Sequence, residues 1–367
     1  MAINKKIKSA QIPVYPLIET LAYPPISDDY AWLDYFELMC LTSLDKCLSK
    51  GAIVEDLDTL KGISPHLVLM TSTDNPAEEE DEQKEEGNAD PHDGLLLEKL
   101  SDDKREDLIG KNESIAKGII YGIIFRQRYF GAWYPFEVIG EAKDEIRVRD
   151  LTNEHRLYIQ LLLSSSLRMI PQQRWKDLTE PFEEISLKVF KVLMPTGWQV
   201  HRFGAKGVIR YKGTLYKKLQ ALSVDIKARF VGKSHYFKKG NNADGGLDLV
   251  AWHSLGDLRS GSPAALAQCG CTLDGWPNKS LEASPARLKN SIVSLVPWLP
   301  YYFMPHDLLV TVSGKQDWQR GNDITECIFV DRFRILTIIK SCEMDPASIF
   351  EKKIFNEFAE KYGFTTI

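Results

Sequence analysis

The sequence predicts an α/β protein in which a C-terminal mixed β-sheet flanked by helices follows an N-terminal α+β region. Three observations favour this class. The 367-residue chain contains 44 % hydrophobic and 26 % charged residues, a composition typical of globular proteins. Helical and strand patterns alternate along the chain from residue 178 onward. The apolar runs are all shorter than the roughly 18 residues that a membrane-spanning helix needs.

These patterns divide the chain near residue 175. We expect residues 1–175 to form the α+β region, with an unassigned recognition or partner-binding role, and residues 176–367 to form a second domain. The first residues lack the apolar core of a signal peptide, so we expect a cytoplasmic protein that does not contact a membrane. The thinly scattered cysteines fit reduced thiols in that compartment; they are Cys40, Cys47, Cys269, Cys271, Cys327 and Cys342.

The elements expected in the first region are two helices around a group of strands. Apolar residues recur every three or four positions over 28–51, which predicts a helix closed by Gly51. Residues 114–151 are rich in Ile, Tyr and Phe between short polar interruptions, which favours two or three strands. Residues 155–170 are a further candidate helix.

An acidic insertion interrupts this region. The stretch Asp74–Asp103 contains thirteen acidic residues and two lysines, and its centre has almost nothing apolar to bury. We therefore expect residues 74–95 to be disordered. The insertion could be a spacer, or a decoy that shields a basic surface when no ligand is bound.

The second region begins with a predicted helix over 178–195, with Thr179 as its cap and Pro195 at its end. A strand over 198–204 and a helix over 211–230 follow. Two apolar segments, 246–254 and 264–272, then predict neighbouring strands joined by a polar turn. Residues 328–336 alternate apolar and charged side chains as a strand would, placing Arg332 and Arg334 on one face. These arginines could hold a phosphate, or pair with acidic residues of the N-terminal half.

The segment 201–240 reverses the charge balance of the chain. It contains eleven lysines and arginines but one acidic residue, in a protein whose formal net charge is −5. Such a concentration of cations favours a phosphate-binding surface, and the aromatic residues between them suit contacts with bases. We expect DNA as the partner, with these candidate contacts: Lys206, Arg210, Lys212, Lys238 and Lys239.

Two polar residues interrupt the neighbouring apolar strands. Asp248 lies between Leu247 and Leu249, and Gln268 lies beside Cys269 on the next strand. A carboxylate and an amide oxygen on adjacent strands could hold a divalent cation together with the backbone carbonyl of Cys269, and magnesium prefers such oxygen ligands. Alternatively, Asp248 caps a turn and Gln268 pairs with the backbone.

The strings 244-DGGLDLVAW-252 and 267-AQCGCTLDGWPNK-279, with the upstream helix that contains Glu183, resemble the core of the PD-(D/E)XK nuclease superfamily in its Mrr-like branch. The resemblance covers roughly residues 178–285 and implies a restriction-endonuclease-like fold. It implies that Asp248, Gln268 and Lys279 are catalytic together with a glutamate of the upstream helix. Glu183 or Glu184 matches that glutamate, and we choose Glu183. It also implies a magnesium or manganese ion held by Asp248, Glu183 and the Cys269 carbonyl.

The superfamily places a lysine two residues after the position of Gln268, where this chain has Gly270. Lys279 is the candidate for a lysine that has migrated to the following helix. The implied function is metal-dependent cleavage of DNA in restriction or antiviral defence. The alternative is an inactive nuclease-fold module that binds nucleic acid or assembles a defence complex. The chain lacks the phosphate-loop, zinc-protease, esterase and dinucleotide-binding motifs, so nothing favours those enzyme classes.

Overall fold

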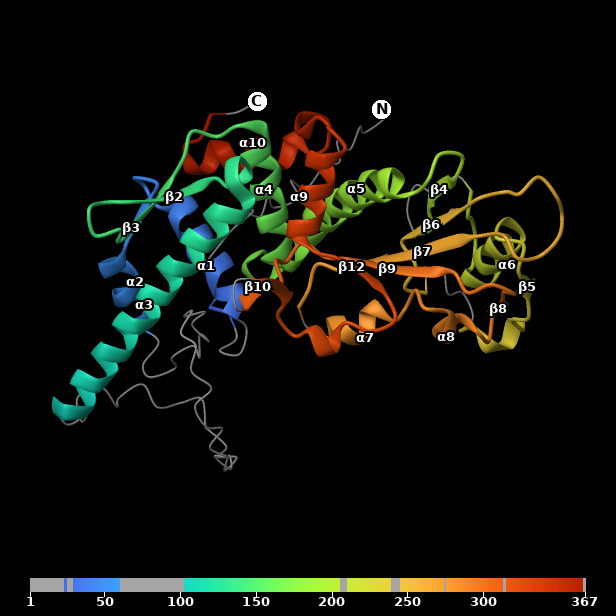
Figure 1. The fold of residues 1–367 in the computed structure, drawn as a ribbon, viewed down its shortest axis with the longest axis horizontal. Coiled ribbons are helices and arrows are strands. Elements are labelled where there is room, and N and C mark those ends of the chain that lie inside the picture. The colour runs from blue at the N-terminus through green and yellow to red at the C-terminus, as the bar shows by residue number, and fades with distance from the viewer. Residues whose placement is uncertain are drawn as a thin grey trace, which may run out of the picture.

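The computed structural model describes residues 23–24, 29–59, 102–204, 210–238, 245–273, 275–312 and 315–365. The acidic insertion at 74–95, Lys206 and Lys239 lie outside the described residues. The described part is a mixed α/β structure with ten α-helices and several sheets. Figure 1 shows the N-terminal elements at one end and the largest sheet at the other.

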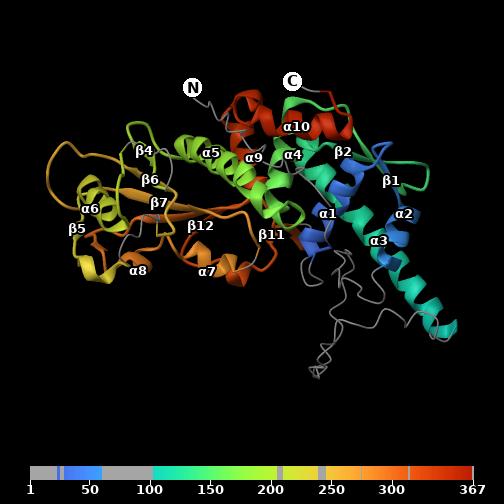
Figure 2. The same cartoon turned by 180° about the vertical axis from the view of Figure 1, so that it is seen from behind.

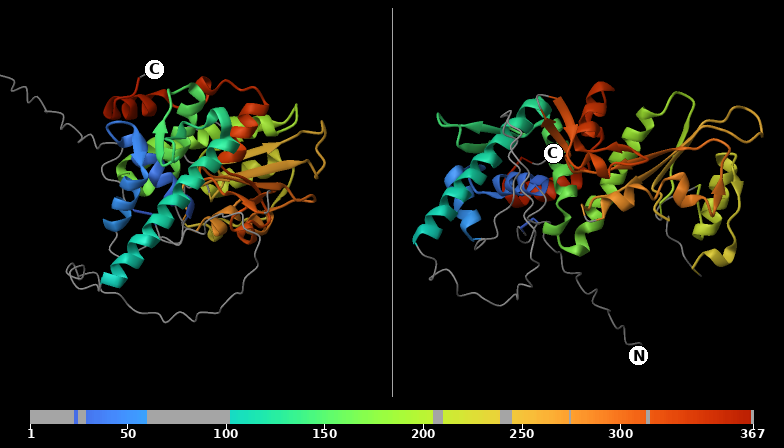
Figure 3. Two further views of the ribbon diagram at one scale, coloured as in Figure 1. Left: turned by 60° about the vertical axis from the view of Figure 1, so that its left-hand side comes forward. Right: turned by 60° about the horizontal axis from the view of Figure 1, so that its bottom comes forward.

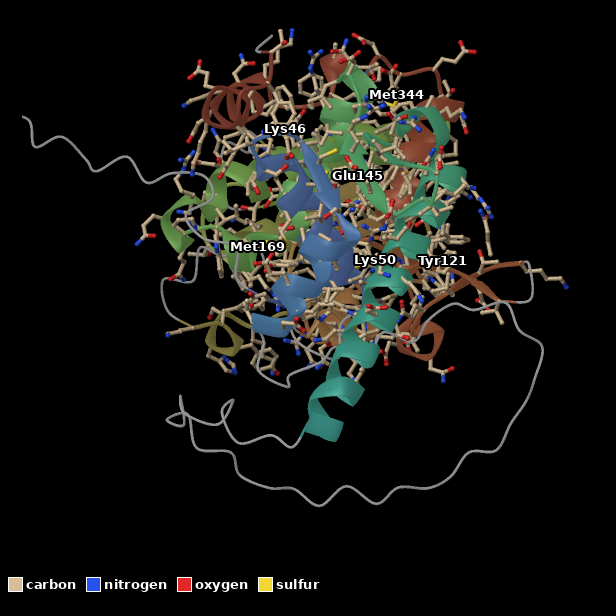
Figure 4. The ribbon with its side chains drawn as sticks, turned by 90° about the vertical axis from the view of Figure 1, so that its left-hand side faces the viewer. Lys46, Lys50, Tyr121, Glu145, Met169 and Met344 are labelled. Carbon is tan, nitrogen blue, oxygen red and sulfur yellow. The ribbon has the colours of Figure 1, made fainter. Side chains whose placement is uncertain are left out.

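The N-terminal region packs four helices around a small antiparallel sheet whose strand order is β1-β3-β2. Its elements are α1 (Asp29–Thr42), β1 (Cys47–Ser49), α2 (Lys50–Thr59), α3 (Asp102–Phe130), β2 (Phe136–Ile139), β3 (Glu145–Val148) and α4 (Asn153–Ser165). Figure 3 shows how far α3 projects beyond the other elements. Figure 4 views the end of this region, with Lys50 of α2, Glu145 of β3 and the exposed Tyr121 of α3 labelled.

Two expectations for this region are wrong in part. The helix over 28–51 ends at Thr42, and β1 and the first turn of α2 follow. Residues 114–130 belong to a helix, while two strands do occur within 131–151. In α3, Ile115, Ile119 and Ile123 recur at four-residue spacing and are buried in the main core. The β-branched composition therefore suggested a strand where the spacing builds one buried helical face.

The C-terminal half is built on a mixed five-stranded sheet of order β12-β9-β7-β6-β4. Strands β4, β6 and β7 pair antiparallel, while β9 runs parallel to both β7 and β12. The sheet strands are β4 (Gln199–Arg202), β6 (Leu249–Trp252), β7 (Ala264–Cys269), β9 (Leu299–Phe303) and β12 (Ile328–Val330). Two short pairs lie outside this sheet: β5 (Arg229–Phe230) with β8 (Ile292–Val293), and β10 (Leu309–Val312) with β11 (Lys315–Trp318).

Helices cover both faces of this sheet, as seen in Figure 2. Helix α5 (Trp175–Leu193) buries Phe182, Ile185 and Val189 in the core that contains Ala265 and Ala267 of β7. Helix α6 (Leu215–Asp225) packs on the opposite face, in a second cluster with Val250 and Leu266. The period of two along each strand therefore sends alternate side chains to different helices. Thr179, the expected cap of α5, lies inside that helix.

The remaining helices close the ends of the sheet. Helices α7 (Trp276–Ser280) and α8 (Pro285–Leu288) lie between β7 and β9 in the chain, and Trp276 packs against Phe329 of β12. Helices α9 (Arg332–Ser341) and α10 (Lys352–Tyr362) return to the N-terminal region, where their buried apolar residues join the main core. One hydrophobic core thus runs continuously across residue 175.

A buried group of charges lies where the two halves meet. Arg332 of α9 is fully buried and donates to Asp34 of α1 at 2.6 and 3.0 Å. Arg126 of α3 contacts Asp34 at 2.8 Å, Glu37 at 2.6 Å and Asp307 at 3.2 Å. Burial would raise the pKa of Asp34, but the charges of Arg332 and Arg126 outweigh it and lower that pKa. Asp34 is therefore held as an anion in the interior.

The expected strand over 328–336 is wrong beyond Val330, because Asp331 caps α9 by accepting from the backbone N–H of Arg334 at 2.9 Å. Arg332 and Arg334 consequently do not share a strand face. The alternative of pairing with the acidic N-terminal half is confirmed for Arg332, whereas Arg334 is exposed and stacks on Trp318 with its guanidinium 4.4 Å from the ring centre. Within the described residues, every helix is too short or too polar to cross a bilayer.

Replacing Arg332 with methionine should destabilise the protein by about 3–5 kcal/mol, because Asp34 and Glu37 would remain buried with one counter-ion fewer. Urea unfolding followed by circular dichroism measures the loss. Arg334→Met is the matched control, two residues away on the same helix but exposed, and it should change stability little. Equal losses for the two variants would contradict a special role for the buried guanidinium.

Candidate active site

Asp248 lies immediately before β6, where the antiparallel register with β7 places it opposite Gln268. Its side chain is buried, with 8 % of the residue exposed, and its Oδ2 accepts a hydrogen bond from the backbone N–H of Cys269 at 2.7 Å. The backbone N–H of Asp248 donates to the carbonyl of Ala267 at 3.0 Å. The ladder and this side-chain bond together fix the direction of the carboxylate, which repays part of its desolvation.

Gln268 contacts the same carboxylate. In the amide orientation that satisfies both of its ends, the Gln268 nitrogen donates to Asp248 Oδ2 at 3.2 Å and to the carbonyl of Gly246. Gly245 and Gly246 both have positive φ, of 70° and 85°, which glycine adopts without strain. The two glycines therefore turn the chain sharply just before Asp248 and bring the Gly246 carbonyl to Gln268.

Helix α5 presents two adjacent glutamates to different surroundings. Glu184 pairs with Arg202 of β4 at 2.9 Å. The pKa values of the Cys269 and Cys271 thiols are raised by burial and, to a smaller extent, by the charges of Glu183 and Asp248. Glu183, the residue chosen from the sequence, thus contributes to the electrostatics at the end of β7.

Lys279 of α7 approaches the same place from another side. Its Nζ donates to Thr272 Oγ1 at 2.7 Å, in the segment between β7 and α7. The pKa of the Cys271 thiol is raised well above its ordinary value by burial and by the charges of Glu183 and Asp248, while the charge of Lys279 lowers it. The charges of all three residues therefore act on the pKa of the Cys271 thiol, although the residues come from three separate parts of the sequence.

Gly270 has a steric partner that the sequence does not reveal. A Cβ at this position would overlap the hydroxyl oxygen of Tyr302 and come within 2.9 Å of its ring carbon Cζ. Tyr302 lies on β9, in register with Gln268, and is fully buried. Its hydroxyl has no hydrogen-bond partner among the described residues, and burial raises its pKa. The space of the expected lysine stem is thus filled by a tyrosine.

Sequence reasoning missed Glu282, Tyr302 and Thr272. The Glu282 side chain lies against Gly246. A Cβ added to Gly246 would come within 2.7 Å of the Cβ of Glu282 and still closer to the Glu282 carboxylate. The three-residue spacing of Glu282 from Lys279 was a usable signal, because a turn after α7 joins the two: the Glu282 backbone N–H donates to the Lys279 carbonyl at 3.0 Å. Tyr302 left no comparable signal, since its place depends on parallel pairing between strands more than 30 residues apart in the chain.

The oxygen groups of the site bear on the magnesium ion that the resemblance implies. The described residues contain no group of three His, Cys, Asp or Glu side chains arranged to hold a metal. Magnesium is, however, commonly held by one or two carboxylates together with waters and substrate phosphates. Asp248 and Glu183 are two carboxylates whose charges both act on the thiols at the end of β7, and carboxylate oxygens are ligands of the kind that this ion takes.

The basic segment has a less uniform role than its composition suggests. Arg210 forms a two-pronged pair with Asp225, at 2.8 and 2.5 Å, and its guanidinium lies 5.0 Å from the ring centre of Trp252. Lys218 is buried. Lys212 and Lys238 are exposed. Of the three described candidates for DNA contact, two therefore present exposed ammonium groups, while Arg210 has an acidic partner within the protein.

Comparisons with protein-family models, with curated proteins and with solved structures gave no match to this chain. The geometry of the site consequently carries the functional argument.

Gly270→Ala should destabilise the protein by about 1–3 kcal/mol, because the added methyl group overpacks against Tyr302. Backbone strain adds nothing, since Gly270 does not have positive φ. Tyr302→Phe should be close to neutral by itself and should recover part of the loss in the double variant, as urea unfolding would measure. Gly110→Ala in α3, where a Cβ meets no atom within 4 Å, is the control and should not destabilise. Strict additivity of the 270 and 302 changes would contradict this packing.

Proposed function

We propose that residues 176–367 form a restriction-endonuclease-like domain that hydrolyses DNA phosphodiester bonds with magnesium or manganese, in cytoplasmic restriction or antiviral defence. The observation that carries the proposal is that Asp248 and Lys279 are both bound to the end of β7 and the residues that follow it: Asp248 accepts from the Cys269 N–H beside Gln268, and Lys279 donates to Thr272. The charges of both residues, with that of Glu183, also act on the pKa of the Cys271 thiol. The sequence separates these residues by up to 96 positions, and the resemblance had assigned all four to one site. The mixed sheet with α5 on one face and α6 on the other agrees with the fold that the resemblance implies.

The chemistry follows from what each group offers. Asp248 and Glu183, with the Cys269 carbonyl, would hold the ion, which supplies positive charge to polarise the scissile phosphate. The bond from the Cys269 N–H keeps the Asp248 carboxylate oriented before substrate arrives. The Lys279 ammonium would stabilise negative charge that develops on the phosphate and orient the attacking water. Gln268 adds no charge, so metal affinity should be weaker than in a site with glutamate at that position.

A second candidate function is an inactive nuclease-fold module that binds nucleic acid or assembles a defence complex. Two observations favour it: Tyr302 fills the space beside Gly270, and the Gln268 amide nitrogen is directed at Asp248. In this alternative, the polar cluster stabilises the fold and the basic surface binds DNA without cleavage.

Asp248→Asn and Lys279→Met should each lower the rate of plasmid nicking in magnesium or manganese on the order of 10²-fold, as expected for loss of one charged group at a reacting phosphate. Glu183→Gln should also lower it. Glu184→Gln is the matched control, since Glu184 is the neighbour of Glu183 on α5 but pairs with Arg202 of β4, and this variant should retain activity close to that of the wild type.

Absence of nicking by the wild-type protein, together with retained DNA binding, would contradict the enzyme function and favour the DNA-binding module. Activity that is equal in the wild type and all four variants would remove the proposed site altogether.

DNA binding should weaken as salt is raised, because each neutralised phosphate releases counterions. Lys212→Ala and Lys238→Ala should each reduce the slope of log K against log salt by about 0.9. Arg210→Ala is the comparison variant and should change the slope less, because Asp225 already neutralises this guanidinium. Fluorescence anisotropy with a labelled duplex measures the slopes, and an equal or larger change for Arg210→Ala would contradict the assignment.

A further inference from the structure

The ammonium group of Lys279 has a defined anchor. Its Nζ donates to Thr272 Oγ1 at 2.7 Å, and its own backbone N–H donates to the carbonyl of Gly275 at 3.1 Å at the start of α7. Thr272 lies in the short segment that joins β7 to α7. The position of the ammonium therefore depends on where this segment is held.

A histidine from a different part of the chain supports that segment. His306 is buried, with 2 % of the residue exposed, and its Nε2 lies 3.2 Å from the carbonyl oxygen of Cys271. Burial lowers the pKa of His306 to about 4, so the ring is neutral near neutral pH. A carbonyl accepts hydrogen bonds and cannot donate them, so Nε2 carries the proton and donates to Cys271.

The support continues to the N-terminal region through Arg332. The Arg332 backbone N–H donates to the carbonyl of His306 at 2.8 Å, and its Nε donates to the carbonyl of Pro305 at 2.7 Å. The same guanidinium is held by Asp34 of α1 at 2.6 Å. A series of contacts thus connects α1 to the candidate catalytic lysine: Asp34 binds Arg332, Arg332 binds the His306 carbonyl, His306 binds Cys271, and Thr272, the next residue, binds Lys279.

Apolar packing holds the segment on one side, where Cys271 belongs to the main core and Leu273 packs in a separate cluster with Trp276. A cleft of about 80 Å³ lies between α1, the residues that follow α4, and the segment Cys271–Leu273. Asp34, His306 and Thr272 line it. On the side that faces this cleft, the bond from His306 restrains the Cys271 carbonyl next to Thr272.

We propose that Thr272 and His306 are positioning residues for Lys279, and that the buried joint with the N-terminal region thereby holds the ammonium group in the candidate site. This inference rests on the proposed function for its catalytic consequence, but the anchoring itself is measurable without activity. The N-terminal region, in addition to any recognition role, then forms part of the catalytic unit.

The first test removes one hydroxyl while keeping the side-chain shape. Thr272→Val should lower kcat for plasmid nicking about 10-fold or more with little change in KM, because substrate binding is left intact while the ammonium loses its anchor. Thr272→Ser retains the hydroxyl and should restore most of the rate. An increased rate in Thr272→Val would overturn the proposal, because it would show that the hydroxyl holds the lysine away from the reaction.

The second readout is the chemical accessibility of the amine. Competitive labelling with acetic anhydride, read by mass spectrometry, should show Lys279 reacting severalfold faster in Thr272→Val than in the wild type, relative to the exposed Lys289. Thr272→Ser should resemble the wild type. Unchanged labelling of Lys279 in Thr272→Val would overturn the anchoring, whether or not the wild type cleaves DNA. Failure to cleave by a wild type that shows the expected labelling would instead remove the proposed function alone.

His306 gives an independent pair of variants. His306→Gln keeps a donor at the place of Nε2, whereas His306→Leu removes it, so labelling of Lys279 should rise in the leucine variant and stay close to wild type in the glutamine variant. Circular dichroism confirms that both fold before labelling. Equal labelling in two folded variants would show that His306 does not support the lysine.

Discussion

A buried guanidinium requires carboxylates around it, and the carboxylate that binds Arg332 lies on α1, almost 300 residues earlier in the chain. Both carboxylate oxygens of Asp34 accept hydrogen bonds from Arg332, and Arg126 of α3 binds the same carboxylate. Removing any one of these groups would leave an uncompensated charge in the interior, so the three helices are constrained to one mutual arrangement. The continuous hydrophobic core supplies most of the stability between the halves, and the ion network fixes which surfaces meet.

This constraint matters for the site because Arg332 also holds the Pro305–His306 turn by its backbone and side chain. The end of β7, where Asp248 and Gln268 meet, lies next to that turn through the bond between His306 and Cys271. The two halves are therefore linked at the point where the candidate chemistry is placed.

Gly270 and Tyr302 occupy complementary space at the end of β7. A lysine at position 270 would meet the tyrosine ring, and the glycine leaves the space that the ring occupies. Lys279 reaches the same end of the sheet from a helix, where Thr272 holds its ammonium. Under the proposed function, these substitutions are coupled: the tyrosine is compatible with activity because the cation enters from elsewhere.

The sequence by itself determined the strand that follows Asp248, the neighbouring strand that contains Gln268, the helix of Glu183 and the mixed α/β class, because these depend on local periodicity and on a short hairpin connection. It did not determine the helical state of residues 114–130, where β-branched composition and helical spacing gave opposite indications. Nor did it determine the fate of Arg332, because burial of a charge depends on partners brought from distant segments. The register that sets Tyr302 over Gly270, and the turn that carries His306 to Cys271, were likewise decided only by the tertiary structure, since long-range pairing and crossover connections leave no periodic signal in the chain.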